Sequence, residues 1–93
     1  IRRIRESRQL IARELERLGL KVIPSQANFV MVDVGAIGMD AASFSSLLLE
    51  RRIAVRDLST FGYPRHVRIT VGTEDQNRLL LEAVGEVISP HEA

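Results

Sequence analysis

The chain has 93 residues, a formal net charge of +1 at pH 7, a hydrophobic fraction of 45% and no cysteine. This length and composition predict one small globular domain, since a disordered chain would be less hydrophobic and a second domain would need more residues. The balanced charge argues against a strongly basic binder of nucleic acid, and the lack of cysteine excludes a disulfide framework, a thiol nucleophile and a Cys-ligated metal.

The first segment, residues 1–18, has the pattern of an amphipathic helix with arginines and glutamates over most of its surface. Its apolar positions recur on one side: Ile4, Ile11, Leu15 and Leu18. Gly19 follows at a position where helices commonly end. No capping residue precedes Ile1, which is not a methionine, so we expect the sequence to be a piece of a longer protein.

The remaining segments alternate between strand and helix patterns. The predicted strands are residues 21–23, 28–34, 53–56 and 66–71, and the predicted later helices are residues 40–52 and 73–88. The T-x-x-Q pattern from Thr73 to Gln76 predicts a capping box at the start of the last helix. This order predicts an α+β fold, with three helices packed mainly on one face of a four-stranded, mostly antiparallel sheet.

Residues 28–34 (NFVMVDV) are almost continuously apolar and rich in β-branched side chains. Such a strand is expected in the middle of the sheet with both of its faces covered, because each face carries apolar groups. The three helices account for one main face only. The second cover is therefore expected from a helix of this chain or from a missing partner domain.

Two arginines are the candidates for function. Residues 66–71 alternate strictly, with Arg68 on the polar face, and Arg56 would lie beside it if the two last strands are neighbours in register. Adjacent guanidiniums repel unless an anion joins them, so a phosphate or carboxylate is the predicted ligand. The alternative is a salt bridge from Arg68 to Asp33 or Asp57, or an arginine that lies on an exposed sheet face.

The other patterns are weak. His66 and His91 are far apart and have no carboxylate at metal-ligand spacing, so no metal site is predicted. Gly35 and Gly38 lack the following lysine of a phosphate loop, and no serine lies in a G-x-S-x-G motif. One tyrosine and three phenylalanines are too few for a nucleic-acid stacking platform, so the basic start of the first helix is interpreted as a solvated face.

Three motifs in this order resemble one known family. They are PSQANF at residues 24–29, IAVRD at residues 53–57 and VRITVGTEDQN at residues 67–77. Together they are similar to the C-terminal small domain of the class I/II pyridoxal-phosphate aminotransferases, which are fold-type I enzymes. Within that family the resemblance is to the histidinol-phosphate branch, and it extends from about residue 4 to residue 88.

The resemblance implies a domain that anchors the substrate of a larger enzyme. That enzyme would transfer an amino group between histidinol phosphate and 2-oxoglutarate or glutamate, in histidine biosynthesis, with pyridoxal phosphate as cofactor. The cofactor and its Schiff-base lysine would lie in a large domain upstream, so residues 1–93 would hold no catalytic or cofactor-binding residue and would be inactive alone. Arg68 matches the arginine that holds the acidic group of the substrate. Arg56 matches the second arginine of that anion pocket, Asn28 matches an asparagine at the domain boundary, and Lys21 matches no family lysine.

The resemblance also implies a cytoplasmic homodimer. Its partners would be a small phosphate- or carboxylate-bearing substrate and the large domain, with no nucleic acid and no membrane, since no apolar run approaches ~20 residues. The substrate stays open, because similar domains serve aromatic-amino-acid aminotransferases and a threonine-phosphate decarboxylase. Two hypotheses of other classes also remain: a free-standing module that binds small anions through Arg56 and Arg68, and a nucleic-acid-binding domain that uses the arginines of the first helix.

Overall fold

The computed structural model describes residues 2–23 and 28–88, and the side chains of the first helix from Glu6 onward. Within these ranges the order of helices and strands is the one that the sequence predicts. The helices are α1 (Arg2–Arg17), α2 (Ala41–Glu50) and α3 (Glu74–Ile88), with short 3-10 helices η1 (Val34–Ile37) and η2 (Ser59–Phe61). The strands are β1 (Lys21–Ile23), β2 (Phe29–Asp33), β3 (Arg56–Asp57) and β4 (His66–Thr70). The side chain of Ile4, most of the PSQANF motif and His91 lie outside the described residues.

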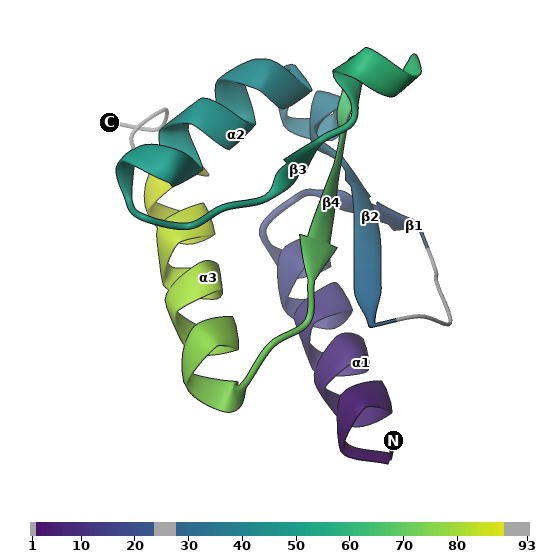
Figure 1. The fold of residues 1–93 in the computed structure, drawn as a ribbon, viewed down its shortest axis with the longest axis vertical. Coiled ribbons are helices and arrows are strands. Elements are labelled where there is room, and N and C mark those ends of the chain that lie inside the picture. The colour runs from purple at the N-terminus through teal and green to yellow at the C-terminus, as the bar shows by residue number, and fades with distance from the viewer. Residues whose placement is uncertain (1, 24–27, 89–93) are drawn as a thin grey trace.

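The four strands form one sheet in the order β1-β2-β4-β3, and each pair of neighbours is antiparallel (Figure 1). This confirms the predicted α+β class with three helices and an antiparallel four-stranded sheet. β4, the strand with strict alternation, lies between β2 and β3. Its register therefore decides which side chains of both neighbours lie beside its own.

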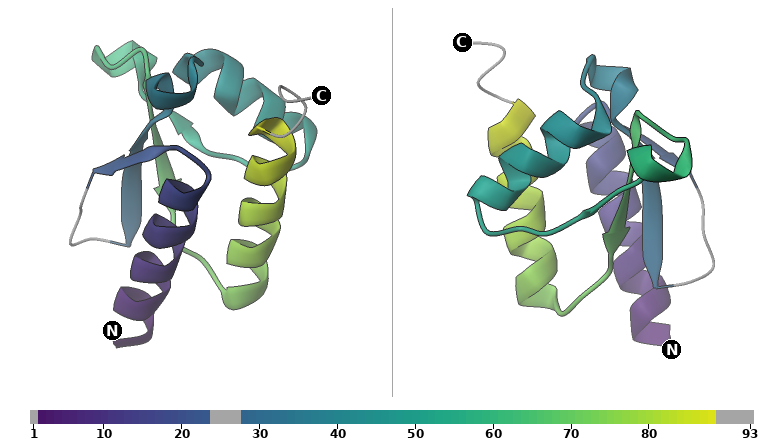
Figure 2. Two further views of the ribbon diagram at one scale, coloured as in Figure 1. Left: turned by 180° about the vertical axis from the view of Figure 1, so that it is seen from behind. Right: turned by 45° about the horizontal axis from the view of Figure 1, so that its top comes forward.

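The helices lie on one side of the sheet, with α1 and α3 next to each other and α2 across one end (Figure 2). They cover a sheet face made by Val30 and Val32 of β2 and Val67 and Ile69 of β4, which are each at most 1% exposed. The helices contribute fully buried side chains to the same core: Ile11, Leu15, Phe44, Leu48 and Val84. Burial of each such side chain stabilises the fold by roughly 1.5–3 kcal/mol, so this face fixes the orientation of the sheet.

Hydrogen bonds at the junction between β4 and α3 fix the direction in which the chain leaves the strand. The predicted capping box is confirmed, since Thr73 Oγ1 accepts from the Gln76 amide at 3.2 Å and Gln76 Oε1 accepts from the Thr73 amide at 2.9 Å. The side chain of Asn77, 7% exposed, also bonds to both backbone groups of Gly72. Its Oδ1 accepts from the Gly72 amide at 2.9 Å, and its Nδ2 donates to the Gly72 carbonyl at 3.2 Å.

Asp40 caps the start of α2, since its Oδ1 accepts from the Ser43 backbone amide at 2.7 Å. That hydrogen bond, with a weaker one from the Ser43 side chain, holds the pKa of Asp40 below its ordinary value. The third strand, however, is shorter and later than predicted: β3 spans Arg56–Asp57 rather than residues 53–56. The reason is that the Ile53 amide donates to the Leu48 carbonyl at the C-terminal end of α2. Residue 53 therefore still belongs to the turn that ends this helix, although the prediction placed it in a strand.

The second face of the sheet is less covered than the apolar run 28–34 predicts. Phe29, Met31 and Arg68 on that face are half-buried, and no helix in the described part of the chain packs over them. Of the two covers that the sequence left open, a helix among the described residues is therefore excluded. The helix face supplies the core, and no helix among the described residues covers the opposite face.

Replacement of Asn77 by alanine removes two hydrogen bonds between a buried side chain and the backbone of Gly72. We expect the free energy of unfolding of the 93-residue chain to fall by about 1–3 kcal/mol, measured by urea denaturation. The control is Arg13→Ala on an exposed position of α1, where a change within ~0.5 kcal/mol is expected. Equal effects of the two substitutions would show that Asn77 does not hold the junction.

Candidate functional site

A row of side chains crosses the open face of the sheet. The register pairs Ile23 with Met31, Met31 with Arg68, and Arg68 with Arg56. Directly opposed residues of antiparallel strands point to the same face, so these four side chains lie in line across the four strands. The two arginines occupy the end of the row formed by β4 and β3. The condition under which the sequence would place Arg56 beside Arg68, neighbouring strands in register, is therefore met.

Arg68 has no carboxylate partner among the described residues. Its half-buried guanidinium lies over the ring of Phe29, with Cζ 5.2 Å from the ring centroid. The two carboxylates that the sequence offered as partners are engaged by backbone amides: Asp33 Oδ1 accepts from Gly35 at 2.8 Å and Asp57 Oδ1 accepts from Ser59 at 2.9 Å. The alternative of a salt bridge from Arg68 to Asp33 or Asp57 is therefore wrong, whereas the other alternative, an arginine on an open sheet face, agrees with the position of Arg68.

The positive charge of Arg56, like that of Arg68, is not neutralised by a described carboxylate. The residue is exposed, its Cζ lies 5.6 Å from the ring centroid of Phe61, and no described carboxylate pairs with it. Like charges directly opposite each other on two strands are destabilising. The sheet therefore presents a doubly positive site of which each half rests on an aromatic ring and neither half is neutralised by the described residues.

Asn28 is not brought into this site. It is exposed and directly precedes β2, and its carbonyl accepts from the Val71 amide at 2.8 Å. Side chains two residues apart in a strand point to the same face, so Asn28 belongs to the face of Val30, whose side chain is buried against the helices. Arg68 is opposite Met31 and lies on the other face. Its backbone thus extends the β2–β4 ladder, and a contact with the substrate remains a prediction.

The contacts of Phe29 and Phe61 with the arginines were missed in the sequence. For Phe29 a signal exists, because it lies two residues before Met31 and therefore diagonal to Arg68 once the register is known. For Phe61 the sequence holds no such signal, because the residue lies in η2 within a loop and meets Arg56 only through the path of that loop.

His66 lies in β4, within the strand predicted for residues 66–71, and its side chain is on the same face as that of Arg68 two residues later. Its ring meets the edge of the Tyr63 ring at 5.6 Å between centroids, and its Nδ1 is buried without a hydrogen-bond partner. In the described part of the chain no three His, Asp or Glu side chains are grouped as metal ligands would be. The histidine therefore contributes no metal site with the described residues.

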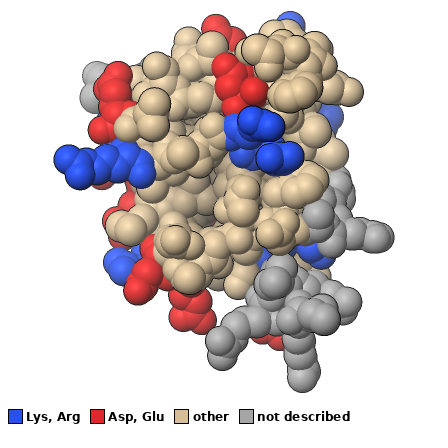
Figure 3. All heavy atoms as spheres, viewed as in Figure 1, with Lys and Arg blue, Asp and Glu red and all other residues tan. Residues whose placement is uncertain are grey.

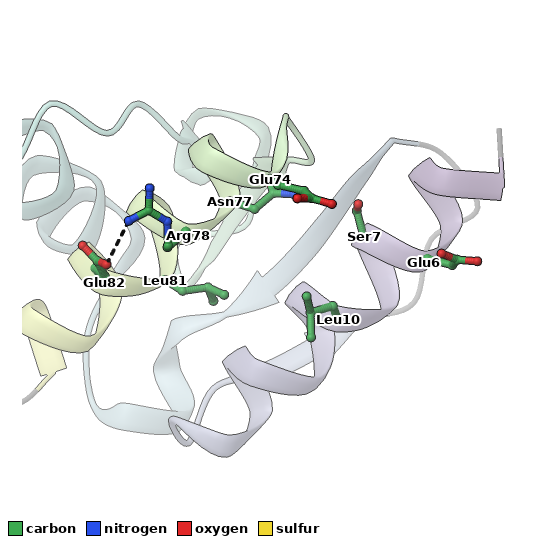
Figure 4. A pocket seen from close by; sticks show the side chains of 8 residues that line it. All are labelled: Glu6, Ser7, Leu10, Glu74, Asn77, Arg78, Leu81 and Glu82. Carbon is green, nitrogen blue, oxygen red and sulfur yellow. Dashed lines mark ion pairs between the residues drawn. The ribbon is translucent and has the colours of Figure 1, made fainter.

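Apart from the row of side chains on the open face, a hollow of about 590 Å³ lies between α1 and α3 on the helix side of the sheet. In Figure 4 its apolar residues Leu10 and Leu81 face each other across the gap. Its rim carries three glutamates, and its one arginine, Arg78, pairs with Asp75 at 3.3 Å and Glu82 at 3.8 Å. The described residues of this hollow carry more negative than positive charge, which disfavours it as a second anion site.

The charges on one face of the molecule do not form a single basic patch. On the face seen in Figure 3, basic and acidic side chains are interspersed and most of the surface is uncharged. That face therefore has no continuous basic surface of the kind that a nucleic-acid interface needs. The nucleic-acid hypothesis rests on the arginines of the first helix, and the side chains of Arg2, Arg3 and Arg5 lie outside the described residues. None of the helices in residues 2–23 and 28–88 is long and apolar enough to cross a membrane.

Comparison with known proteins places this chain in a family. The family model for "Aminotransferase class I and II" matches residues 1–84. A histidinol-phosphate aminotransferase from Symbiobacterium thermophilum is 44% identical over 80 residues, which cover 86% of this chain and 21% of that protein. The chain therefore belongs to the class I and II aminotransferase family, and the predicted resemblance is confirmed.

Solved structures have the same fold. The L-threonine-O-3-phosphate decarboxylase from Porphyromonas gingivalis superimposes with a TM-score of 0.86 at 28% identity, over 96% of this chain and 28% of that one. The histidinol-phosphate aminotransferase from Clostridium acetobutylicum superimposes with a TM-score of 0.85 at 24% identity, over 94% of this chain and 27% of that one. The chain thus spans about a quarter or less of the length of the relatives that it matches.

The arginine pair should weaken the fold when no anion is bound. Arg56→Met keeps a flexible side chain against the Phe61 ring and removes the repulsion with Arg68. We expect the free energy of unfolding at low salt to stay unchanged or to rise by up to about 0.5 kcal/mol, because two exposed charges repel by under ~1 kcal/mol. The gain should shrink in 1 M salt.

The matched control for this stability measurement is Arg51→Met. Arg51 Nε lies 3.0 Å from Glu86 Oε1, and its Nη1 donates to the Leu47 carbonyl at 3.1 Å. Its loss should lower the free energy of unfolding by about 0.5–1.5 kcal/mol. A loss of that size for Arg56→Met instead would show that Arg56 has a structural partner.

Proposed function

We propose that residues 1–93 are the C-terminal small domain of a pyridoxal-phosphate-dependent aminotransferase and bind the acidic group of its substrate through Arg68 and Arg56. The observation that carries this proposal is the cross-strand pair itself, two opposed arginines without a carboxylate partner among the described residues. A folded domain gains nothing in stability from such a pair unless an anion joins it.

The best supported substrate is a phosphate monoester, and we propose histidinol phosphate. Two guanidiniums supply two positive charges and several planar donors, which match the nearly −2 charge and three acceptor oxygens of a phosphate monoester better than a single carboxylate. The relative from Symbiobacterium thermophilum is named for histidinol phosphate, and the structure from Porphyromonas gingivalis for a threonine phosphate. The amino group would be exchanged between histidinol phosphate and 2-oxoglutarate or glutamate, in histidine biosynthesis.

The same site would serve the second substrate of the exchange. Glutamate and 2-oxoglutarate carry a side-chain carboxylate, which one guanidinium holds with two parallel hydrogen bonds. Fixing the acidic end of each substrate orients the reacting end, and such orientation is the contribution that this chain would make to the rate. Asn28 stays in the proposal as a substrate contact at the domain boundary, with less support than the arginines because the strand register does not place it in their row.

The chemistry of the cofactor lies outside this chain in our proposal. Pyridoxal phosphate supplies an electron sink for the bonds at the reacting carbon and needs a lysine for its Schiff base. The one lysine here, Lys21, is exposed at the start of β1 and opposite Asp33, so it does not fit that role. A large domain of the same protein would hold the cofactor and its lysine, the whole enzyme would be a cytoplasmic homodimer, and the 93 residues alone would be inactive.

The test uses the full-length protein that contains this chain. Arg68→Gln and Arg56→Gln should each lower kcat/KM for histidinol phosphate about 10- to 150-fold, because a hydrogen bond to a charged group contributes ~1.5–3 kcal/mol. The same substitutions should change kcat/KM for histidinol, which lacks the phosphate, by less than about threefold. Arg13→Gln, on an exposed position of α1, is the matched control and should change neither value.

Two results would contradict the proposal. One is an unchanged kcat/KM for histidinol phosphate in both arginine variants. The other is an equal loss with histidinol and histidinol phosphate, which would mean that the arginines do not bind the phosphate. The absorbance of the bound cofactor shows that each variant is loaded, and activity with O-phosphothreonine separates a decarboxylase from an aminotransferase.

A further inference from the structure

The guanidiniums of Arg68 and Arg56 contact aromatic rings that lie toward opposite ends of β4. Phe29 is opposite Thr70, at the C-terminal end of β4, and its ring holds the guanidinium of Arg68. η2, which carries Phe61, follows β3 toward the N-terminal end of β4, where the Leu58 amide donates to the His66 carbonyl. In Figure 1, η2 and the start of β2 lie at opposite ends of β4.

Both contacts have the geometry of a cation–π interaction. The distances from Cζ to the ring centroid, 5.2 Å for Arg68 and 5.6 Å for Arg56, are within the ~6 Å at which a guanidinium is attracted to an aromatic face. An arginine on an exposed sheet face otherwise samples many rotamers, and two opposed arginines would move apart in no fixed direction.

Phe61 has little other packing in the described residues. Its side chain is 61% exposed, and η2 ends directly after it at Gly62, whose φ of +90° closes the turn. Tyr63, two residues further, is also exposed at 49% but meets His66 rather than an arginine. The loop therefore offers two exposed aromatic residues, of which only Phe61 lies against a member of the arginine pair.

We propose that Phe61 and Phe29 are positioning residues for the anion site, holding Arg56 and Arg68 apart along β4 so that an anion enters between guanidiniums that are already oriented. This inference rests on the proposed function, because it assigns these rings a role only if the arginine pair binds substrate. Such preorganisation lowers the ordering that the ligand must impose on two flexible side chains. Its loss should weaken binding of the anion and leave the chemical step almost unchanged.

The experiment measures steady-state kinetics of the full-length enzyme with histidinol phosphate, and competitive inhibition by inorganic phosphate. Phe61→Leu should raise KM and the inhibition constant of phosphate about two- to fivefold, with kcat within twofold of the parent. Phe61→Tyr keeps an aromatic face and should restore both values. Tyr63→Leu, the matched control in the same loop, should leave both unchanged.

A double-mutant comparison separates positioning from general loop damage. In an Arg56→Gln background, Phe61→Leu should have no further effect on KM, because the ring then has no guanidinium to hold. The proposal is overturned if Phe61→Leu acts equally in both backgrounds, if it acts no more than Tyr63→Leu, or if it leaves phosphate binding unchanged while Arg56→Gln weakens it. If Arg56→Gln and Arg68→Gln themselves have no effect on KM, the proposed function fails first.

Discussion

The site depends on the register of β4 between β2 and β3. Val67 and Ile69 are buried against the helices, and this burial forces Arg68 onto the opposite face beside Met31 and Arg56. A slip of one residue would place the arginine in the core and the valine in solvent, at a cost of several kcal/mol. The hydrophobic effect on one face of the sheet thus positions the charged groups on the other.

The two faces of the sheet have different roles. The helix face is closely packed and supplies stability, and the Asn77 side chain holds Gly72 where the chain leaves β4 for α3. On the open face the arginines face each other without a neutralising carboxylate among the described residues, an arrangement that weakens the domain alone and favours an anion. Rigid strands hold such a pair more accurately than loops would, as the proposed anchoring of a substrate requires.

Much of this arrangement can be predicted from the sequence, since alternation and capping are local signals. The alternation of residues 66–71 gives the face of Arg68, and the T-x-x-Q pattern gives the start of α3. The bounds of β3 depend on how the chain closes α2, and the contact of Phe61 with Arg56 depends on the path of a loop. Both are tertiary features without a periodic signal, so they were missed.

The most direct measurement is a crystal structure of the full-length protein with histidinol phosphate bound. The arrangement of the open face predicts phosphate oxygens within hydrogen-bond distance of both Arg68 and Arg56, with the two residues still directly opposed on β4 and β3. A phosphate held by other groups, with Arg68 and Arg56 paired instead to carboxylates from the rest of the protein, would contradict it. In that case the pair would be an interdomain contact rather than the anchor for substrate.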